Sequence, residues 1–179
     1  MTHLSIDGGR PLAGATHIQG SKNVFLHLAA AVLLSDRPVQ LRNVPRITDT
    51  GVVADIISAV GARVSIEGTT FSVHAANFGD GVIPPDLGAR IRPTACFGAA
   101  LLARTGRAVF PTPGGDAFTV RHIDLHLGAM RAAGAEVRTV NGTVTARTSG
   151  LRGFSFDCTT SGGFGPSLGA TVSALLLAA

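Results

Sequence analysis

A repeat within the chain is the sequence feature that most restricts its fold. Gly-Ala-Arg-Val at 61–64 is followed by a short turn and by Thr-Phe-Ser-Val at 70–73. The pattern recurs as Gly-Ala-Glu-Val at 134–137, followed by Asn141-Gly142 and by Thr-Val-Thr at 143–145. Asn-Gly between β-branched residues is typical of a type I′ hairpin turn. Each copy therefore predicts two antiparallel strands that follow a glycine.

The segments before each hairpin also correspond. An apolar helix ends near 33–34 in one copy and near 101–102 in the other, and short strands at 39–41 and 107–110 follow. A second helix, at 50–60 or 122–133, then ends at the repeated glycine, which suits a left-handed cap. We predict two copies of helix, strand, helix, strand and hairpin strand, at 22–75 and 91–147, joined by a linker at 79–88. A third copy begins at 154–156 and ends within an apolar helix from Ser167.

Composition narrows the class of protein. The chain has 179 residues, 45% of them hydrophobic and only 15% charged, which favours one packed core. The N-terminus lacks the pattern of a secretory signal, and no apolar run is long enough to cross a bilayer. Two cysteines indicate reduced thiols in a cytoplasmic protein. The net charge of +4 is dispersed and there is no Tyr or Trp, so neither nucleic acid nor a membrane is expected as a partner.

Two glycine-rich turns open helices that could bind an anion. At 20–23, Gly-Ser-Lys-Asn follows a predicted strand at 16–18 and supplies Lys22, the one lysine among fifteen basic residues. At 165–171, Gly-Pro-Ser-Leu-Gly-Ala-Thr opens the third copy's helix. Backbone N–H groups at a helix start suit phosphate or carboxylate. An ordinary capped helix start explains each turn equally well.

Two further segments could take part in anion binding or in catalysis. Arg90 and Arg92 precede the second copy's first helix, where an anion would offset their conflict with the helix dipole, although solvated surface arginines are the alternative. The loop at 111–121 carries Asp116 at its tip, and a carboxyl group there could donate a proton, although an ordinary Gly-Asp turn is the alternative. His126 shows no metal-ligand spacing, and we interpret it as structural or surface-exposed.

Taken in order, these segments resemble an enzyme family. Gly-Ser-Lys-Asn at 20–23, Leu-Arg-Asn-Val-Pro at 41–45, Arg92, the loop at 113–127 and Pro-Ser-Leu-Gly-Ala-Thr at 166–171 are similar to motifs of the UDP-N-acetylglucosamine 1-carboxyvinyltransferases, which are enolpyruvyl transferases. The resemblance implies an α/β fold: an inside-out α/β barrel of repeated βαβαββ units, with helices inside and sheets outside.

The resemblance also implies how the chain divides. Members of the family are more than twice this length and have two domains. Residues 1–19 would be an N-terminal strand segment that belongs to the second domain. Residues 20–179 would be an incomplete first domain with units at about 20–77, 88–150 and 151–179, truncated in the third. The rest of the second domain, or a partner chain that supplies it, would be missing, and with it the family's catalytic base.

The activity implied is transfer of the enolpyruvyl group of phosphoenolpyruvate to the 3-hydroxyl of UDP-N-acetylglucosamine, an early committed step of peptidoglycan synthesis. No cofactor or metal is implied. Asp116 would be the general acid, at a position where the family usually has cysteine, and Lys22 would be the second catalytic residue. The residues implied to bind substrate are Lys22, Asn23, Arg92, Arg121, His122, Ile123, Asp124, Leu125, Gly165, Pro166, Ser167 and Leu168.

Two departures bear on the acceptor. Phe-Thr-Val-Arg-His at 118–122 stands where the family usually has Ile-Gly-Ala-Arg-Pro, and Gly165 replaces a residue that is often basic. Transfer to another nucleotide, such as uridine monophosphate, is therefore an alternative. A non-catalytic nucleotide-binding remnant is another, and we expect little or no turnover from the isolated chain.

Overall fold

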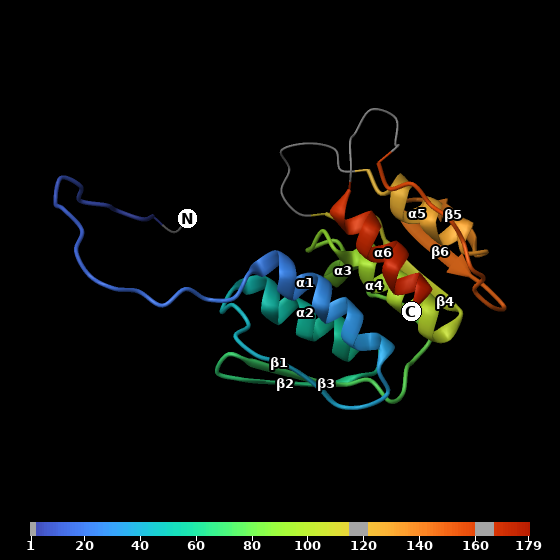
Figure 1. Cartoon of the computed structure of the whole chain (residues 1–179), viewed down its shortest axis with the longest axis horizontal. Helices are drawn as coiled ribbons and strands as arrows, with labels where there is room; N and C mark the ends of the chain where they lie inside the picture. The colour runs from blue at the N-terminus through green and yellow to red at the C-terminus, as the bar shows by residue number, and fades with distance from the viewer. Residues whose placement is uncertain (1–2, 115–121, 160–166) are drawn as a thin grey trace.

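The computed structural model, shown in Figure 1, describes residues 3–114, 122–159 and 167–179. The first copy of the repeat forms α1 (Lys22–Ala31), η1 (Val32–Leu34), β1 (Val39–Leu41), α2 (Thr48–Ala59), β2 (Arg63–Glu67) and β3 (Thr70–His74). After α3 (Pro85–Gly88), the second forms α4 (Thr94–Thr105), β4 (Arg107–Pro111), α5 (Asp124–Ala132), β5 (Glu136–Val140) and β6 (Thr143–Arg147). The third contributes α6 (Leu168–Ala178).

The two sheets confirm the repeat. One has the strand order β1-β3-β2 and the other β4-β6-β5, and every pair within them is antiparallel. In the hairpin turn, Asn141 and Gly142 have φ values of 48° and 73°, as a type I′ turn requires. Gly61 and Gly134, just after α2 and α5, have φ values of 101° and 96°, so the predicted left-handed caps are also confirmed.

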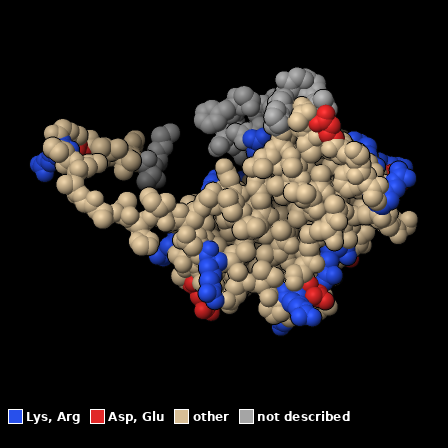
Figure 2. All heavy atoms as spheres, viewed as in Figure 1, with Lys and Arg blue, Asp and Glu red and all other residues tan. Residues whose placement is uncertain are grey.

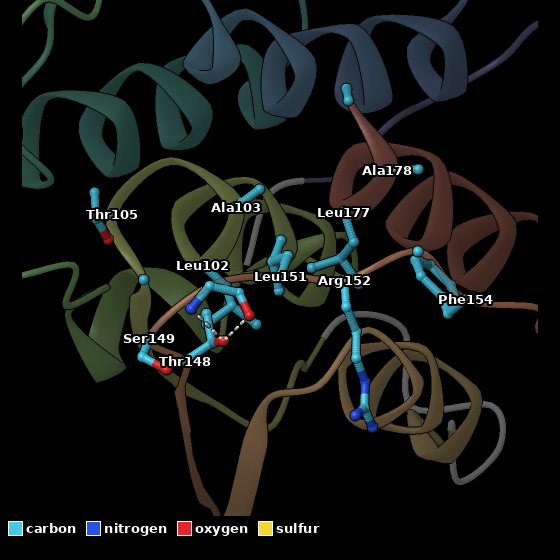
Figure 3. A pocket seen from close by; sticks show the side chains of 14 residues that line it. Leu102, Ala103, Thr105, Thr148, Ser149, Leu151, Arg152, Phe154, Leu177 and Ala178 are labelled. Atoms are coloured by element: carbon cyan, nitrogen blue, oxygen red, sulfur yellow. Dashed lines mark hydrogen bonds between the residues drawn. The ribbon is translucent and has the colours of Figure 1, made fainter.

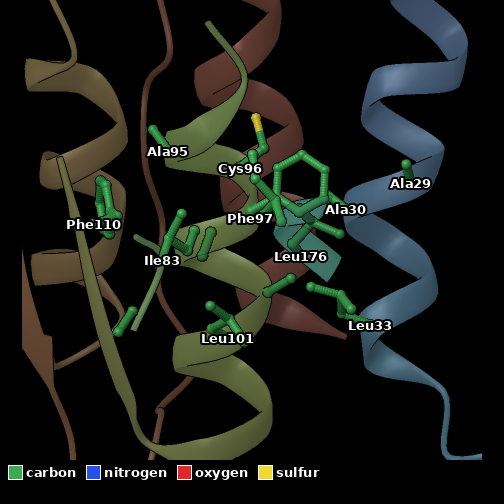
Figure 4. Packing of buried hydrophobic residues seen from close by; sticks show 14 of the residues in the cluster. Ala29, Ala30, Leu33, Ile83, Ala95, Cys96, Phe97, Leu101, Phe110 and Leu176 are labelled. Atoms are coloured by element: carbon green, nitrogen blue, oxygen red, sulfur yellow. The ribbon is translucent and has the colours of Figure 1, made fainter. Parts of the chain in front are cut away.

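The helices lie inside and the sheets lie outside, as expected for this fold (Figure 1). Helix α4 packs against α1, α5 and α6 on its several sides and against β4. Figure 4 shows Phe97 of α4 pointing towards Ala30 of α1, and both side chains are fully buried. On another side of α4, a Cβ added at Gly98 would come within 2.4 Å of the Phe110 ring, so only glycine allows this close contact between helix and strand.

The linker between the copies is more regular than predicted. It contains α3, a single helical turn that begins with Pro85 at a position suited to proline. Just before α3, the linker pairs with β4 in parallel: Ile83 N–H donates to the Val109 carbonyl, and Val109 N–H donates to the Gly81 carbonyl, each at 2.8 Å. The second sheet is thereby extended by a short bridge.

The predicted strand at 16–18 is not formed in this chain. Residues 3–19 lie outside every strand, all of them are exposed, and the segment extends away from the body of the molecule (Figure 1). A strand needs a neighbour to satisfy its backbone groups, and the described residues offer this segment none. Leu12 is accordingly 100% exposed. In the third copy, the described residues 151–159 likewise form no strand.

Candidate anion-binding site

The inner helices share one orientation. In Figure 1, α1, α4 and α6 run in the same direction, so their N-terminal ends lie on the same side of the molecule. N-terminal helix ends carry partial positive charge and unsatisfied N–H groups. Side chains cap two of them: the Ser21 hydroxyl accepts from Val24 N–H at 3.4 Å, and the Ser167 hydroxyl accepts from Ala170 N–H at 3.2 Å. The two helix starts singled out in the sequence are therefore formed.

Lys22 is the first residue of α1 and forms an ion pair with the next helix. Its Nζ lies 2.6 Å from Oδ2 of Asp49, in the first turn of α2, and the lysine side chain is 53% exposed. An exposed pair of this kind adds little stability, but it fixes the direction of the ammonium group. Gly20 is needed here for space rather than for its φ, because a Cβ at this position would come 1.9 Å from the Asn43 carbonyl oxygen.

His126 of α5 was not among the predicted site residues, and the structure buries it. It is only 8% exposed, and its Nδ1 has no hydrogen-bond partner among the described residues. Its Nε2 lies against the first turn of α6, where a Cβ at Gly169 would come within 2.8 Å. Buried polar nitrogens are nearly always paired in folded proteins, so we expect a partner for this nitrogen that the described residues do not supply.

Two more side chains act electrostatically on this ring. The pKa of His126 is lowered from 6.5 to about 4, first by burial, then by the positive charge of Arg92 and then by that of His27. Arg92 is exposed in the turn before α4, and His27 is half-buried on α1. The positive charges that act on this ring, near the start of α6, favour an anion there. His126 itself is neutral at physiological pH because its pKa is about 4. We call Arg92 and His27, together with the neutral His126 ring on which they act, the cationic group.

The other predicted residues are placed as follows. Asn23 is exposed at the start of α1, and Leu168 is exposed at the start of α6. His122 and Asp124 are exposed and lie 3.5 Å apart, between Nδ1 and Oδ2. Ile123 is half-buried, and the Leu125 side chain is buried at 8% exposure. Four predicted site residues lie outside the described residues: Asp116, Arg121, Gly165 and Pro166.

The charge distribution on one face and the position of one cavity bear on where a substrate could bind. Figure 2 shows a face whose middle is largely uncharged, with most Lys and Arg side chains towards its edges. A cavity of about 720 Å³ lies between the C-terminal ends of α4 and α6 and the segment 148–154 (Figure 3). None of the predicted site residues lines it, so it is separate from the cationic group.

Two negative findings concern the described residues alone. They contain no cluster of His, Cys, Asp and Glu suited to a metal ion. Nor does any helix among them have the length and apolar character needed to span a membrane.

The fold is that of the enolpyruvyl transferases. The structure is similar to the enolpyruvyl transferase NikO from Streptomyces tendae, with a TM-score of 0.77 and 29% identity over 95% of this chain and 39% of that one. It also shares its fold with EPSP synthase from Acinetobacter baumannii, at a TM-score of 0.64 and 15% identity over 92% of this chain and 37% of that one.

The sequence agrees, and the chain belongs to the EPSP synthase (3-phosphoshikimate 1-carboxyvinyltransferase) family, whose model matches residues 6–179. It is 37% identical to a UDP-N-acetylglucosamine 1-carboxyvinyltransferase of Maricaulis maris, over 99% of this chain and 42% of that protein. A protein of the same name from Caulobacter is also 37% identical, over 86% of this chain and 37% of that protein. The chain thus spans about two fifths of the length of these relatives.

Proposed function

We propose that this chain forms one wall of a site that transfers the enolpyruvyl group of phosphoenolpyruvate to the 3-hydroxyl of UDP-N-acetylglucosamine. The relatives' names support this reaction, and so does the cationic group near the start of α6. The observation that contributes most is His126, a buried ring whose Nδ1 has no hydrogen-bond partner among the described residues and on which the positive charge of Arg92 acts. A diphosphate would supply the negative charge that Arg92 favours.

In the proposed reaction, the sugar hydroxyl oxygen bonds to C2 of phosphoenolpyruvate and gives up its proton to the catalytic base that the resemblance places in the second domain, while C3 accepts a proton. Loss of a proton from C3 and cleavage of the bond to phosphate then release phosphate and the enolpyruvyl ether. Lys22 and Asn23 would bind phosphoenolpyruvate, and Asp116 would donate the proton. Arg121, the residues from His122 to Leu125 and those from Gly165 to Leu168 would hold the nucleotide. The product would enter peptidoglycan synthesis.

Calorimetric titration of the chain with UDP-N-acetylglucosamine tests the acceptor. We expect binding that weakens about tenfold or more in Arg92→Gln, because a charge-assisted hydrogen bond is lost. Arg138→Gln is the matched control, since Arg138 is exposed on β5 and pairs with Glu136. Equal affinities in the two variants would contradict the assignment of Arg92.

Because His122 and Gly165 depart from the family's usual motifs, uridine monophosphate is a second candidate acceptor. A parallel titration with uridine monophosphate separates the two. Clearly tighter binding of the monophosphate would make it the acceptor, whereas preference for the diphosphate sugar would support the first proposal.

A further inference from the structure

The three inner helices differ in how completely they are covered. Helices α1, α4 and α6 are the first helices of the three copies of the repeat. Helix α4 contacts α1, α5 and α6, and every residue from Thr94 to Leu102 is buried. By contrast, the buried residues of α1 and of α6 lie along one side of each helix. The middle helix is therefore enclosed, whereas its two counterparts keep an open side.

The open sides of α1 and α6 carry large apolar side chains. On α1, Val24 and Leu28 are 57% and 46% exposed. They are four residues apart, so they lie on the same side of the helix, one turn from each other. On α6, Leu175 is 65% exposed. We call the open sides of these two helices, marked by Val24, Leu28 and Leu175, the α1–α6 face.

The α1–α6 face is continuous and uncharged. The two helices contact each other, and both lie towards the viewer in Figure 1. Figure 2, drawn in the same view, shows that the middle of this surface has no charge. Helix α6 contains no Lys, Arg, Asp or Glu, and the only one in α1 is Lys22, at its first position. A helix without a charged side is normally buried, so we expect a protein surface to cover this face.

We propose that the α1–α6 face is the interface of a homodimer, in which it packs against the same face of a second copy. A two-fold interface brings a surface patch against its own copy, so the patch must be compatible with itself. An uncharged apolar face meets this condition, because no charge is buried without a partner. The Lys and Arg side chains towards the edges of the face would stay in solvent. This interface does not depend on the proposed reaction.

The test is sedimentation equilibrium of the chain between about 10 µM and about 1 mM. The two helices have 10 and 11 residues, so each is only about 15 Å long. We therefore expect a weak dimer, with a dissociation constant on the order of 100 µM. Leu28→Glu and Leu175→Glu should each raise this constant about tenfold or more, because the two-fold interface would bury two unpaired carboxylates.

Two matched controls place the same charge at exposed apolar positions elsewhere. Val140→Glu lies on β5, where Val140 is 63% exposed, and Leu12→Glu lies in the N-terminal segment, where Leu12 is 100% exposed. Both variants should dimerise like the original chain. Circular dichroism and urea unfolding of all four variants show whether each keeps the fold.

The outcomes are distinct. A chain that stays monomeric up to about 1 mM overturns the proposal, and another polypeptide would then have to cover the face. An assembly that Leu12→Glu or Val140→Glu weakens as much as Leu28→Glu does would also overturn it, because association would then not run through the α1–α6 face. A dimer lost only in the Leu28 and Leu175 variants, with their fold unchanged, supports it.

Discussion

His126 and Gly169 are in a contact that no larger residue at position 169 would allow. The His126 Nε2 lies where a Cβ at residue 169 would come within 2.8 Å, closer than real Cβ contacts. The glycine therefore lets the imidazole of α5 rest against the first turn of α6. Because Ser167 caps that same turn, the contact fixes the ring beside the helix end at which we place the nucleotide.

Gly169→Ala should move this ring and weaken nucleotide binding. Alanine normally stabilises a helix by about 0.5 to 1 kcal/mol relative to glycine. Gly51→Ala is the matched control, because Gly51 of α2 has nothing within 4 Å of an added Cβ and should show that gain. We expect Gly169→Ala to be less stable than the control by about 1 to 3 kcal/mol in urea unfolding. Equal stability, with an unchanged His126 NMR signal, would contradict the contact.

Stability should fall in mild acid because of His126. Its folded-state pKa of about 4 lies below the 6.5 usual for histidine, so between these values the unfolded chain binds more protons. The free energy of unfolding therefore rises with pH through this window, and the stability is lost as the pH falls from 6.5 to 4. The contribution amounts to about 3 kcal/mol.

His126→Met isolates this contribution from that of the carboxyl groups. Methionine is a flexible apolar side chain that fits buried space of this kind. Urea unfolding of both proteins at pH 7 and at pH 4.5 should show a smaller loss of stability in the variant. A parallel loss in both would mean that His126 does not titrate as described.

The parts of the fold that the sequence predicted well depend on local chemistry. The left-handed caps at Gly61 and Gly134 and the Asn141-Gly142 turn follow from backbone conformations that few residues adopt. The strand at 16–18 failed for the opposite reason. Whether an extended segment becomes a strand depends on a neighbour elsewhere in the chain, and a local pattern cannot supply that information.

The candidate site likewise has parts that follow from local sequence and parts that depend on the fold. The helix starts at Ser21 and Ser167 could be predicted because capping is local. The grouping around His126 could not, because only the fold brings Arg92 and His27 near it. Its place just after the loop that carries Asp116 was the one signal available. Leu125 was included on the resemblance, and its position in the sequence does not show that its side chain is buried.

The two cysteines should differ sharply in reactivity. Cys96 is buried and its pKa is raised to about 11 by burial, an effect that a hydrogen bond from Ser173 partly offsets. Its thiol also donates to the Gly169 carbonyl at 3.4 Å. Because the thiolate is the reactive form, Cys96 should resist iodoacetamide at pH 8. Half-buried Cys158 should be labelled first.

Peptide mass mapping checks this order. The native chain should carry one label, on Cys158, and the chain in denaturant should carry two. Rapid labelling of Cys96 in the native chain would show that α4 and α6 separate readily.

The identity of residue 116 sets a last prediction, which rests on the sequence because Asp116 lies outside the described residues. An epoxide that alkylates the cysteine usual at this position in the family should leave this chain unmodified there, since a carboxyl group lacks the thiolate's nucleophilicity. Asp116→Cys should gain one adduct in the peptide that contains residue 116. Protonation of C3 needs a group that gives up a proton and no covalent bond, so either residue can serve. An adduct on Asp116 itself would mean that this carboxylate acts as a nucleophile, and the proton would then have to come from another group.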